Sequence, residues 1–128
     1  NTKAQNAKQN EPHALKKADA DFREGLEASR DGNLVLARAK FADVVKLAPQ
    51  IPEGHEALGA VLLELGKPAD AILELEAAQK LKPHDAGNEA NLALAFAETG
   101  ETAKAIPHFD EALHLSKEPG QTPLTSPY

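Results

Sequence analysis

Residues 58–83 read LGAVLLELGKPADAILELEAAQKLKP, and this stretch decides the fold. It contains two amphipathic runs, one ending at Leu65 and the other extending from Pro68 to Leu81. Gly66 lies between them, and glycine readily adopts the left-handed conformation that commonly follows the end of a helix. Because the turn is so short, the two helices must lie antiparallel. The stretch therefore predicts a helical hairpin.

The same pattern recurs every 34 residues, in one register and without a gap. Four columns of matched residue type carry the repeat: Gly32, Gly66 and Gly100; Ala37, Ala71 and Ala105; Phe41, Leu75 and Phe109; Leu47, Leu81 and Leu115. One hairpin is too small to bury its own apolar face, so the units must stack on one another. The sequence predicts an all-α fold of three antiparallel helix pairs that offers an extended surface to a partner.

The repeats are expected at residues 18–51, 52–85 and 86–119, in a domain that covers residues 12–117. Residues 1–11 are polar and lack an apolar stripe, which predicts a flexible lead-in, with Pro12 in the first turn of the first helix. Residues 118–128 contain several prolines and no periodicity, which predicts an irregular tail. The later helices are expected at about residues 34–47, 54–65, 68–81, 86–99 and 102–115, with a slight bend at Pro107 in the last.

Composition excludes several classes of function. The chain has 20 acidic and 14 basic residues, a formal charge of −6, which argues against non-specific nucleic-acid binding. It has no cysteine, so it forms no disulfide and no Cys-based zinc site. No run of about 18 apolar residues occurs, so we expect no membrane insertion. The compartment stays open on these data.

No constellation of catalytic or metal-binding residues emerges from the sequence. The five histidines are interpreted as separate surface residues, because no two of them share a helical face. His55 is expected to face either solvent or a helix interface. The glycines follow the repeat period instead of forming a phosphate-binding loop, and the carboxylates alternate with lysines and arginines as on a solvated helix face. We therefore expect no enzyme activity, no metal and no cofactor.

The chain resembles the tetratricopeptide repeat (TPR) family over all three units. Each first helix has a small residue where its partner helix approaches (Gly25, Gly59, Ala93), followed by Ala28, Leu62 and Phe96, and each second helix repeats the spacing of Ala37, Phe41 and Val44. Pro49 and Pro83 end the first two units. The resemblance implies a right-handed α-solenoid. One departure is that Asp21, His55 and Glu89 replace the bulky aromatic that the family has early in each first helix.

The resemblance also implies that the first helices line a concave peptide-binding groove. The groove residues that it implies are Phe22, Arg23, Leu26, Arg30, Glu53, Glu56, Ala60, Leu63, Glu64, Ala90, Asn91, Leu94, Ala97 and Glu98. For the three leucines, an alternative role in the core is equally consistent with the sequence. The groove would have an apolar floor with more acidic than basic side chains along it.

This chemistry favours a protein or peptide ligand, either an amphipathic helix or an extended segment with basic flanks. A carboxylate-gripping subfamily uses Lys, Asn and Arg at positions that Phe22, Leu26, Glu53 and Ala57 occupy here, so that binding mode is disfavoured. Two alternatives remain: a self-assembly unit that forms homo-oligomers through its repeat edges, where Ile106, Phe109 and Leu113 lie, and an accessory domain of an enzyme active site.

Overall fold

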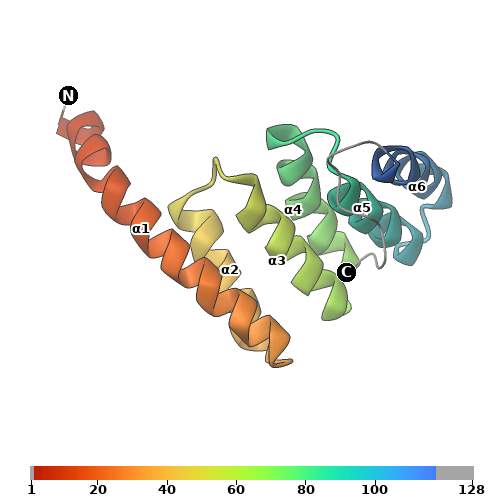
Figure 1. Ribbon diagram of the computed structural model, residues 1–128, viewed down its shortest axis with the longest axis horizontal. Helices are drawn as coiled ribbons and strands as arrows, with labels where there is room; N and C mark the ends of the chain where they lie inside the picture. The colour runs from red at the N-terminus through yellow and green to blue at the C-terminus, as the bar shows by residue number, and fades with distance from the viewer. Residues whose placement is uncertain (1, 118–128) are drawn as a thin grey trace.

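The computed structural model describes the backbone of residues 2–117 and the side chains of residues 12–117. The described part is built of six α-helices: α1 (Thr2–Arg30), α2 (Leu34–Leu47), α3 (Pro52–Glu64), α4 (Pro68–Leu81), α5 (Ala86–Glu98) and α6 (Thr102–Ser116). Consecutive helices pair as antiparallel hairpins, α1 with α2, α3 with α4 and α5 with α6 (Figure 1). The hairpins stack in chain order as a right-handed α-solenoid, so the expected fold class is confirmed.

A glycine in the left-handed region closes each hairpin turn. Gly32, Gly66 and Gly100 have φ of 79°, 76° and 84°. In the middle turn, the amide of Lys67 donates to the carbonyl of Leu62 at 2.8 Å, which is the long-range bond of a Schellman motif. The equivalent bonds occur in the other two turns. The glycine column therefore recurs because a side chain in this conformation would be strained.

In the core of each of the first two hairpins, one large side chain of the second helix packs directly against a glycine of the first helix. Phe41 and Leu75 are almost fully buried at 1% and 0% exposure. A Cβ built on Gly25 would lie 2.5 Å from Cε1 of Phe41, and one built on Gly59 would lie 2.5 Å from Cδ2 of Leu75. The small residue at the helix crossing thus admits the large residue of the partner helix.

Two helix starts differ from the sequence expectation. α1 begins at Thr2, so the expected flexible lead-in over residues 1–11 is helical from Thr2 onward and Pro12 lies inside the helix. Residues 2–11 are rich in Ala, Lys and Gln, which favour a helix even without an apolar stripe. α3 begins at Pro52, two residues earlier than expected, because proline is well accommodated at the first helical position. The expected tail, residues 118–128, lies outside the described residues.

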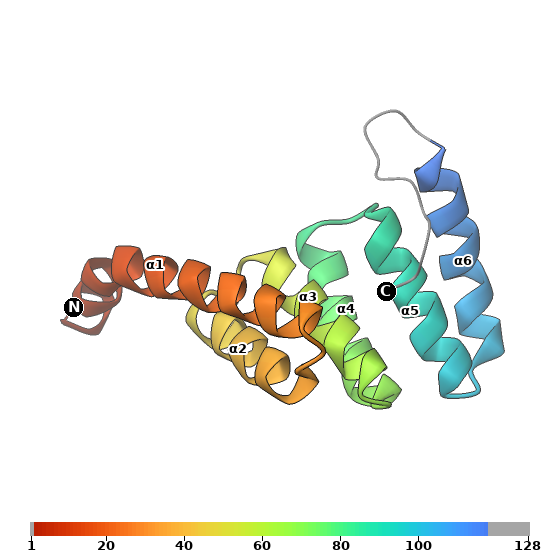
Figure 2. The same cartoon turned by 60° about the horizontal axis from the view of Figure 1, so that its bottom comes forward.

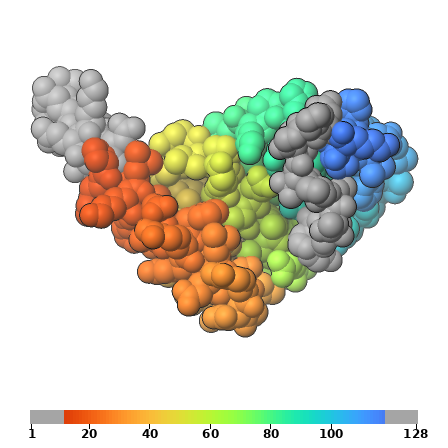
Figure 3. Space-filling view, viewed as in Figure 1, coloured from red at the N-terminus to blue at the C-terminus, as the bar shows by residue number. Residues whose placement is uncertain are grey.

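The first helices α1, α3 and α5 follow one another along the solenoid, and each second helix lies alongside its own first helix, as α6 does beside α5 (Figure 2). Besides the contacts within hairpins, α2 packs against α3, α4 against α5, and α3 against α5. α6 runs unbroken from Thr102 to Ser116 with Pro107 inside it. The hairpin of α1 and α2 forms one end of the molecule, and that of α5 and α6 forms the other (Figure 3).

Candidate binding groove

The centre of the groove is a pocket of about 320 Å³ between the three first helices. Its six lining residues are Phe22 from α1, Glu53, Glu56, Ala57 and Ala60 from α3, and Asn91 from α5. α3 contributes most of the wall because it is the middle first helix. The pocket therefore exists only when all three repeats are stacked.

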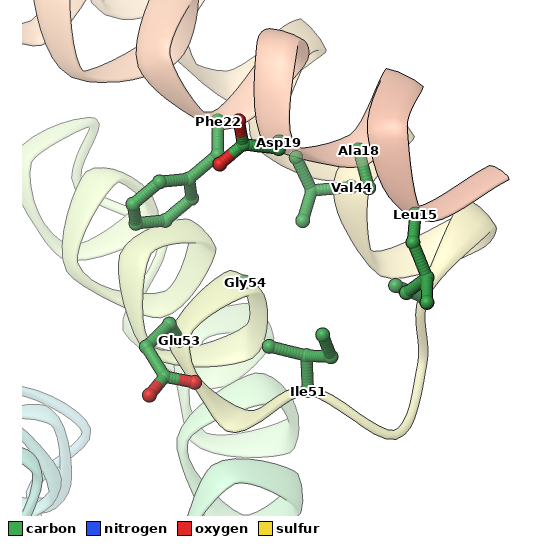
Figure 4. A pocket seen from close by; sticks show the side chains of 9 residues that line it. Leu15, Ala18, Asp19, Phe22, Val44, Ile51, Glu53 and Gly54 are labelled. Carbon is green, nitrogen blue, oxygen red and sulfur yellow. The ribbon is translucent and has the colours of Figure 1, made fainter. Parts of the chain in front are cut away.

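A second pocket of about 390 Å³ adjoins it on the side of α1. The two pockets share Phe22 and Glu53, so they lie next to each other along the inner side of α1 and α3. The apolar wall of the second pocket comes from Leu15, Ala18, Val44, Ala48 and Ile51, with Asp19 and Gly54 completing it. Phe22 from α1 and Glu53 from α3 lie at the same edge of this second pocket, on the side away from Leu15 (Figure 4).

Phe22 belongs to both the core and the groove. Its ring centroid lies 5.5 Å from that of Phe41, with the rings tilted by 52°. The residue is only partly buried, and it lines both pockets. Phe22 therefore packs against the interior with part of its surface, and its exposed part is available to a ligand.

Glu56 and Asp85 bring two carboxyl groups together at the edge of the central pocket. A Cβ built on Gly87 would lie 3.6 Å from Oε1 of Glu56 and 3.7 Å from Oδ2 of Asp85. Burial, the charge of Asp85 and a hydrogen bond to Asp85 together raise the pKa of the Glu56 carboxyl to about 7. Lys82 opposes this effect, and its Nζ lies 3.7 Å from Oδ1 of Asp85.

Asp85 also fixes the start of α5. Its side chain accepts a hydrogen bond from the backbone amide of Asn88 at 3.0 Å, so it caps the helix. The preceding residue, His84, has a positive φ of 64° and brings the chain into this turn. The carboxylate that Glu56 faces is therefore held in place by the backbone.

Asn91 places an amide group in the wall of the central pocket. The residue is only 5% exposed. Among the side chains that the structure describes, none donates a hydrogen bond to its Oδ1. A buried acceptor without a donor is costly, so this oxygen is an unsatisfied hydrogen-bond acceptor beside the pocket.

One polar pair joins the two helices of each hairpin, which the sequence analysis missed. Asp21 lies 3.8 Å from Lys40, His55 lies 2.8 Å from Glu74, and Glu89 lies 2.6 Å from His108. The two residues of each pair are 19 positions apart in the sequence, so the pair recurs in every hairpin. The first residue of each pair occupies the position at which the resemblance predicts a bulky aromatic residue.

Two of the histidines therefore lie between helices: for His55 the helix-interface alternative is the one observed, and for His108 the interpretation as a separate surface residue is wrong. His55 is buried, and its Nε2 lies 2.8 Å from the carbonyl oxygen of Pro49. His108 stacks on Phe96 with ring centroids 5.5 Å apart. The sequence signal was the occurrence of an ionisable residue in all three aromatic positions, opposite Lys40, Glu74 and His108.

The structure distributes the predicted groove residues over three environments. Phe22, Glu53, Glu56, Ala60 and Asn91 line the pockets. Arg23, Leu26, Arg30, Glu64, Ala97 and Glu98 are exposed on the same helices outside the two pockets. Leu63 and Ala90 are buried at 5% and 1% exposure, and Leu94 is partly buried against the core. The prediction did not include the wall contributed by α2 and the α2–α3 turn, namely Val44, Ala48 and Ile51.

The described residues hold no group of three or more histidine, aspartate or glutamate side chains arranged to bind a metal ion. Likewise, none of the helices within the described range combines the length and the hydropathy that a membrane crossing requires.

Comparison with known proteins places this geometry in a family. A family model for the tetratricopeptide repeat matches residues 22–86. The chain is 32% identical over 90 residues to the TPR repeat-containing protein PA4299 of Pseudomonas aeruginosa, and the match covers 70% of this chain and 36% of that protein. The chain thus spans about a third of the length of this relative.

Solved structures share the fold. A MamA variant superposes with a TM-score of 0.73 at 24% identity, covering 79% of this chain and 74% of that one. The TPR2B domain of yeast Sti1, solved in complex with pHsp70, gives a TM-score of 0.75 at 24% identity, covering 79% and 81%.

Proposed function

Because the chain belongs to the tetratricopeptide repeat family, we propose that it is a protein-interaction module whose concave groove binds a segment of a partner protein. The observation that carries this proposal is the hollow made of two adjoining pockets, which share Phe22 and Glu53. The related fold of the Sti1 domain is seen in complex with pHsp70, which is consistent with such a role.

The chemistry of the hollow favours a ligand with apolar and basic side chains. Leu15, Val44 and Ile51 offer an apolar wall at one end. Glu53 and Glu56 line the central part, and no basic residue lines either pocket. Arg23, the nearest arginine along α1, is engaged by Asp19 at 2.7 Å. A peptide with leucine-like and cationic residues is therefore complementary to the groove.

The proposal is tested by selecting ligands from a displayed library of random peptides about 12 residues long. Ala60→Arg fills the central pocket from a partly exposed position on α3 and is expected to abolish capture of the selected peptides. Ala42→Arg is the matched control, because it makes the same change at an exposed site on α2. Equal capture by both folded variants would place the binding surface elsewhere.

A second candidate function, self-assembly, rests on the outer face of α6. Ile106, Phe109 and Leu113 are 54%, 38% and 53% exposed. Two α6 helices that meet antiparallel would bury these side chains against each other and bring Glu101 of one copy near Lys117 of the other. Sedimentation equilibrium over a range of concentrations tests this function. A dimer that Leu113→Asp dissociates supports it, and a monomer at every concentration excludes it.

A further inference from the structure

We propose that the central pocket is a receptor for one cationic side chain, a lysine or an arginine, of the bound peptide. This inference rests on the proposed function of the groove and assigns a specific role to Glu53, Glu56 and Asn91. It identifies the part of the ligand that sets specificity.

The pocket combines the features that a guanidinium or ammonium group requires. Glu53 and Glu56 supply carboxylate oxygens on neighbouring turns of α3. Asn91 supplies a buried acceptor oxygen to which no described residue donates. Phe22 supplies an aromatic ring in the wall, which attracts a cation, and Ala57 and Ala60 are small enough to leave room for its alkyl stem.

The unpaired acceptor is the observation that distinguishes this pocket from an ordinary acidic surface. The Asn91 side chain is almost fully buried, so its Oδ1 cannot be satisfied by bulk water. The Oδ1 atom itself has almost no exposed surface, so a charged donor that enters between α1 and α3 would reach it once the Asn91 side chain turns toward the pocket, and the donor would pair with the carboxylates at the same time. Neither a carboxylate nor an apolar side chain could do so.

Proton release is expected to accompany cation binding. Below neutral pH the proton that Glu56 shares with Asp85 lowers the negative charge of the pocket, because burial and the neighbouring carboxylate raise the pKa of Glu56 to about 7. A bound cation favours the ionised form. The charged groups that face Glu56 are Glu53 on its own helix, and Lys82 and Asp85 on the α4–α5 turn. Affinity should therefore rise as the pH increases through neutrality.

Calorimetric titration with designed peptides tests the inference. The probes are acetylated and amidated peptides Ala-Leu-Ala-X-Leu-Ala-Leu, in which X is Arg, Lys, Gln or Glu. We expect the Arg or Lys peptide to bind about tenfold more tightly than the Gln peptide, and the Glu peptide to bind least. From about pH 6 to about pH 8 the advantage should grow about tenfold, with proton release visible in buffers of different ionisation enthalpy.

Three substitutions test whether the preference for a cationic side chain and the proton release arise in the central pocket. Glu56→Gln should remove both the preference for a cation and the proton release. Asn91→Leu should weaken binding of the Arg peptide and leave binding of the Glu peptide unchanged. Glu98→Gln is the control, because it changes the same charge on an exposed part of α5 outside the pocket and should keep both properties.

The outcomes separate this inference from the proposed function. If all four peptides bind the groove equally, the receptor is overturned while peptide binding stands. If n-butylguanidinium alone binds as tightly as the Arg peptide, the pocket serves a small cation and the peptide assignment fails. If no probe binds, the receptor is overturned, and the library selection decides the proposed function independently.

Discussion

The two ends of the solenoid expose side chains of opposite character, charged at one end and apolar at the other. Two positions of the first helix differ between the repeats. They are occupied by buried apolar residues in α3 (Leu58 and Val61) and in α5 (Leu92 and Ala95). In α1 the same two positions are occupied by Glu24 and Glu27, which are both exposed. Glu24 pairs with Lys40 at 2.6 Å. This face of α1 is therefore charged where the same face of α3 and α5 is apolar.

The opposite end stays apolar. Leu75 of α4 is 0% exposed, whereas Phe109, its equivalent in α6, is 38% exposed. No further hairpin covers Phe109 within the described chain, and Ala93 has a Cβ where the other repeats have Gly25 and Gly59. The difference shows that burial at a repeat position depends on both the neighbouring hairpin and the partner residue at the crossing.

The largest difference in stability is expected when the two equivalent residues Leu75 and Phe109 are each truncated to alanine. Leu75→Ala should lower the free energy of unfolding by about 3 kcal/mol, since it leaves a cavity in a closed core. Phe109→Ala should cost only about 1 kcal/mol, because its ring is already partly hydrated. Chemical denaturation of both variants measures the difference. Equal losses would show that the third hairpin is packed as tightly as the second.

A smaller effect is expected from adding a methyl group at the helix crossing. Gly59→Ala should destabilise the fold by about 2 kcal/mol, because its Cβ would overlap Leu75. Gly87→Ala is the control, since its Cβ would have ordinary contacts at 3.6 Å and the helix gains from alanine. Thermal unfolding should show a lower Tm for the first variant and an unchanged or higher one for the second. The reverse order would contradict the packing described.

The interhelical pairs predict a further difference between the ends. Glu89→Ala should cost about 1.5–2 kcal/mol, because its buried carboxylate holds both Gln79 and His108. Asp21→Ala should cost about 1 kcal/mol or less, because Lys40 keeps Glu24 as a second partner. Urea denaturation at low ionic strength compares the two. A larger loss for Asp21→Ala would mean that the first pair is the more important one.

The smallest change in stability is expected at the charged end. Glu27→Leu lies on an exposed face and should alter the free energy of unfolding by less than about 0.5 kcal/mol. It should nevertheless promote association, because it gives α1 an apolar residue at the position of Val61 and Ala95. Light scattering at rising concentration detects the change. Unaltered scattering would show that this charge does not protect the end.

The repeat register made most of the fold predictable. Each of Gly32, Gly66 and Gly100 serves a turn that requires positive φ, and this requirement is visible in a single sequence. The start of α1 was missed because residues 2–11 form a helix without the apolar spacing that signals one. The interhelical pairs were missed because residues such as His55 and Glu74 become neighbours only after the hairpin forms.

The site was less predictable than the fold. Register places Glu53, Glu56 and Asn91 on the inner helices, but it does not show that Leu63 and Ala90 turn into the core. That distinction depends on how far the hairpins rotate against one another. The wall formed by Ala48 and Ile51 also depends on the path of the α2–α3 turn, which helical periodicity does not describe.

The central claim is that the inner face of α1, α3 and α5 holds the partner. Amide chemical-shift mapping of the isotope-labelled chain with a library-selected peptide tests it most directly. The account predicts that the largest shifts surround Ala57, Ala60 and Asn91, with smaller shifts near Phe22. Shifts confined to the outer helices, for example around Ala42 or along Ile106 and Leu113, would contradict it.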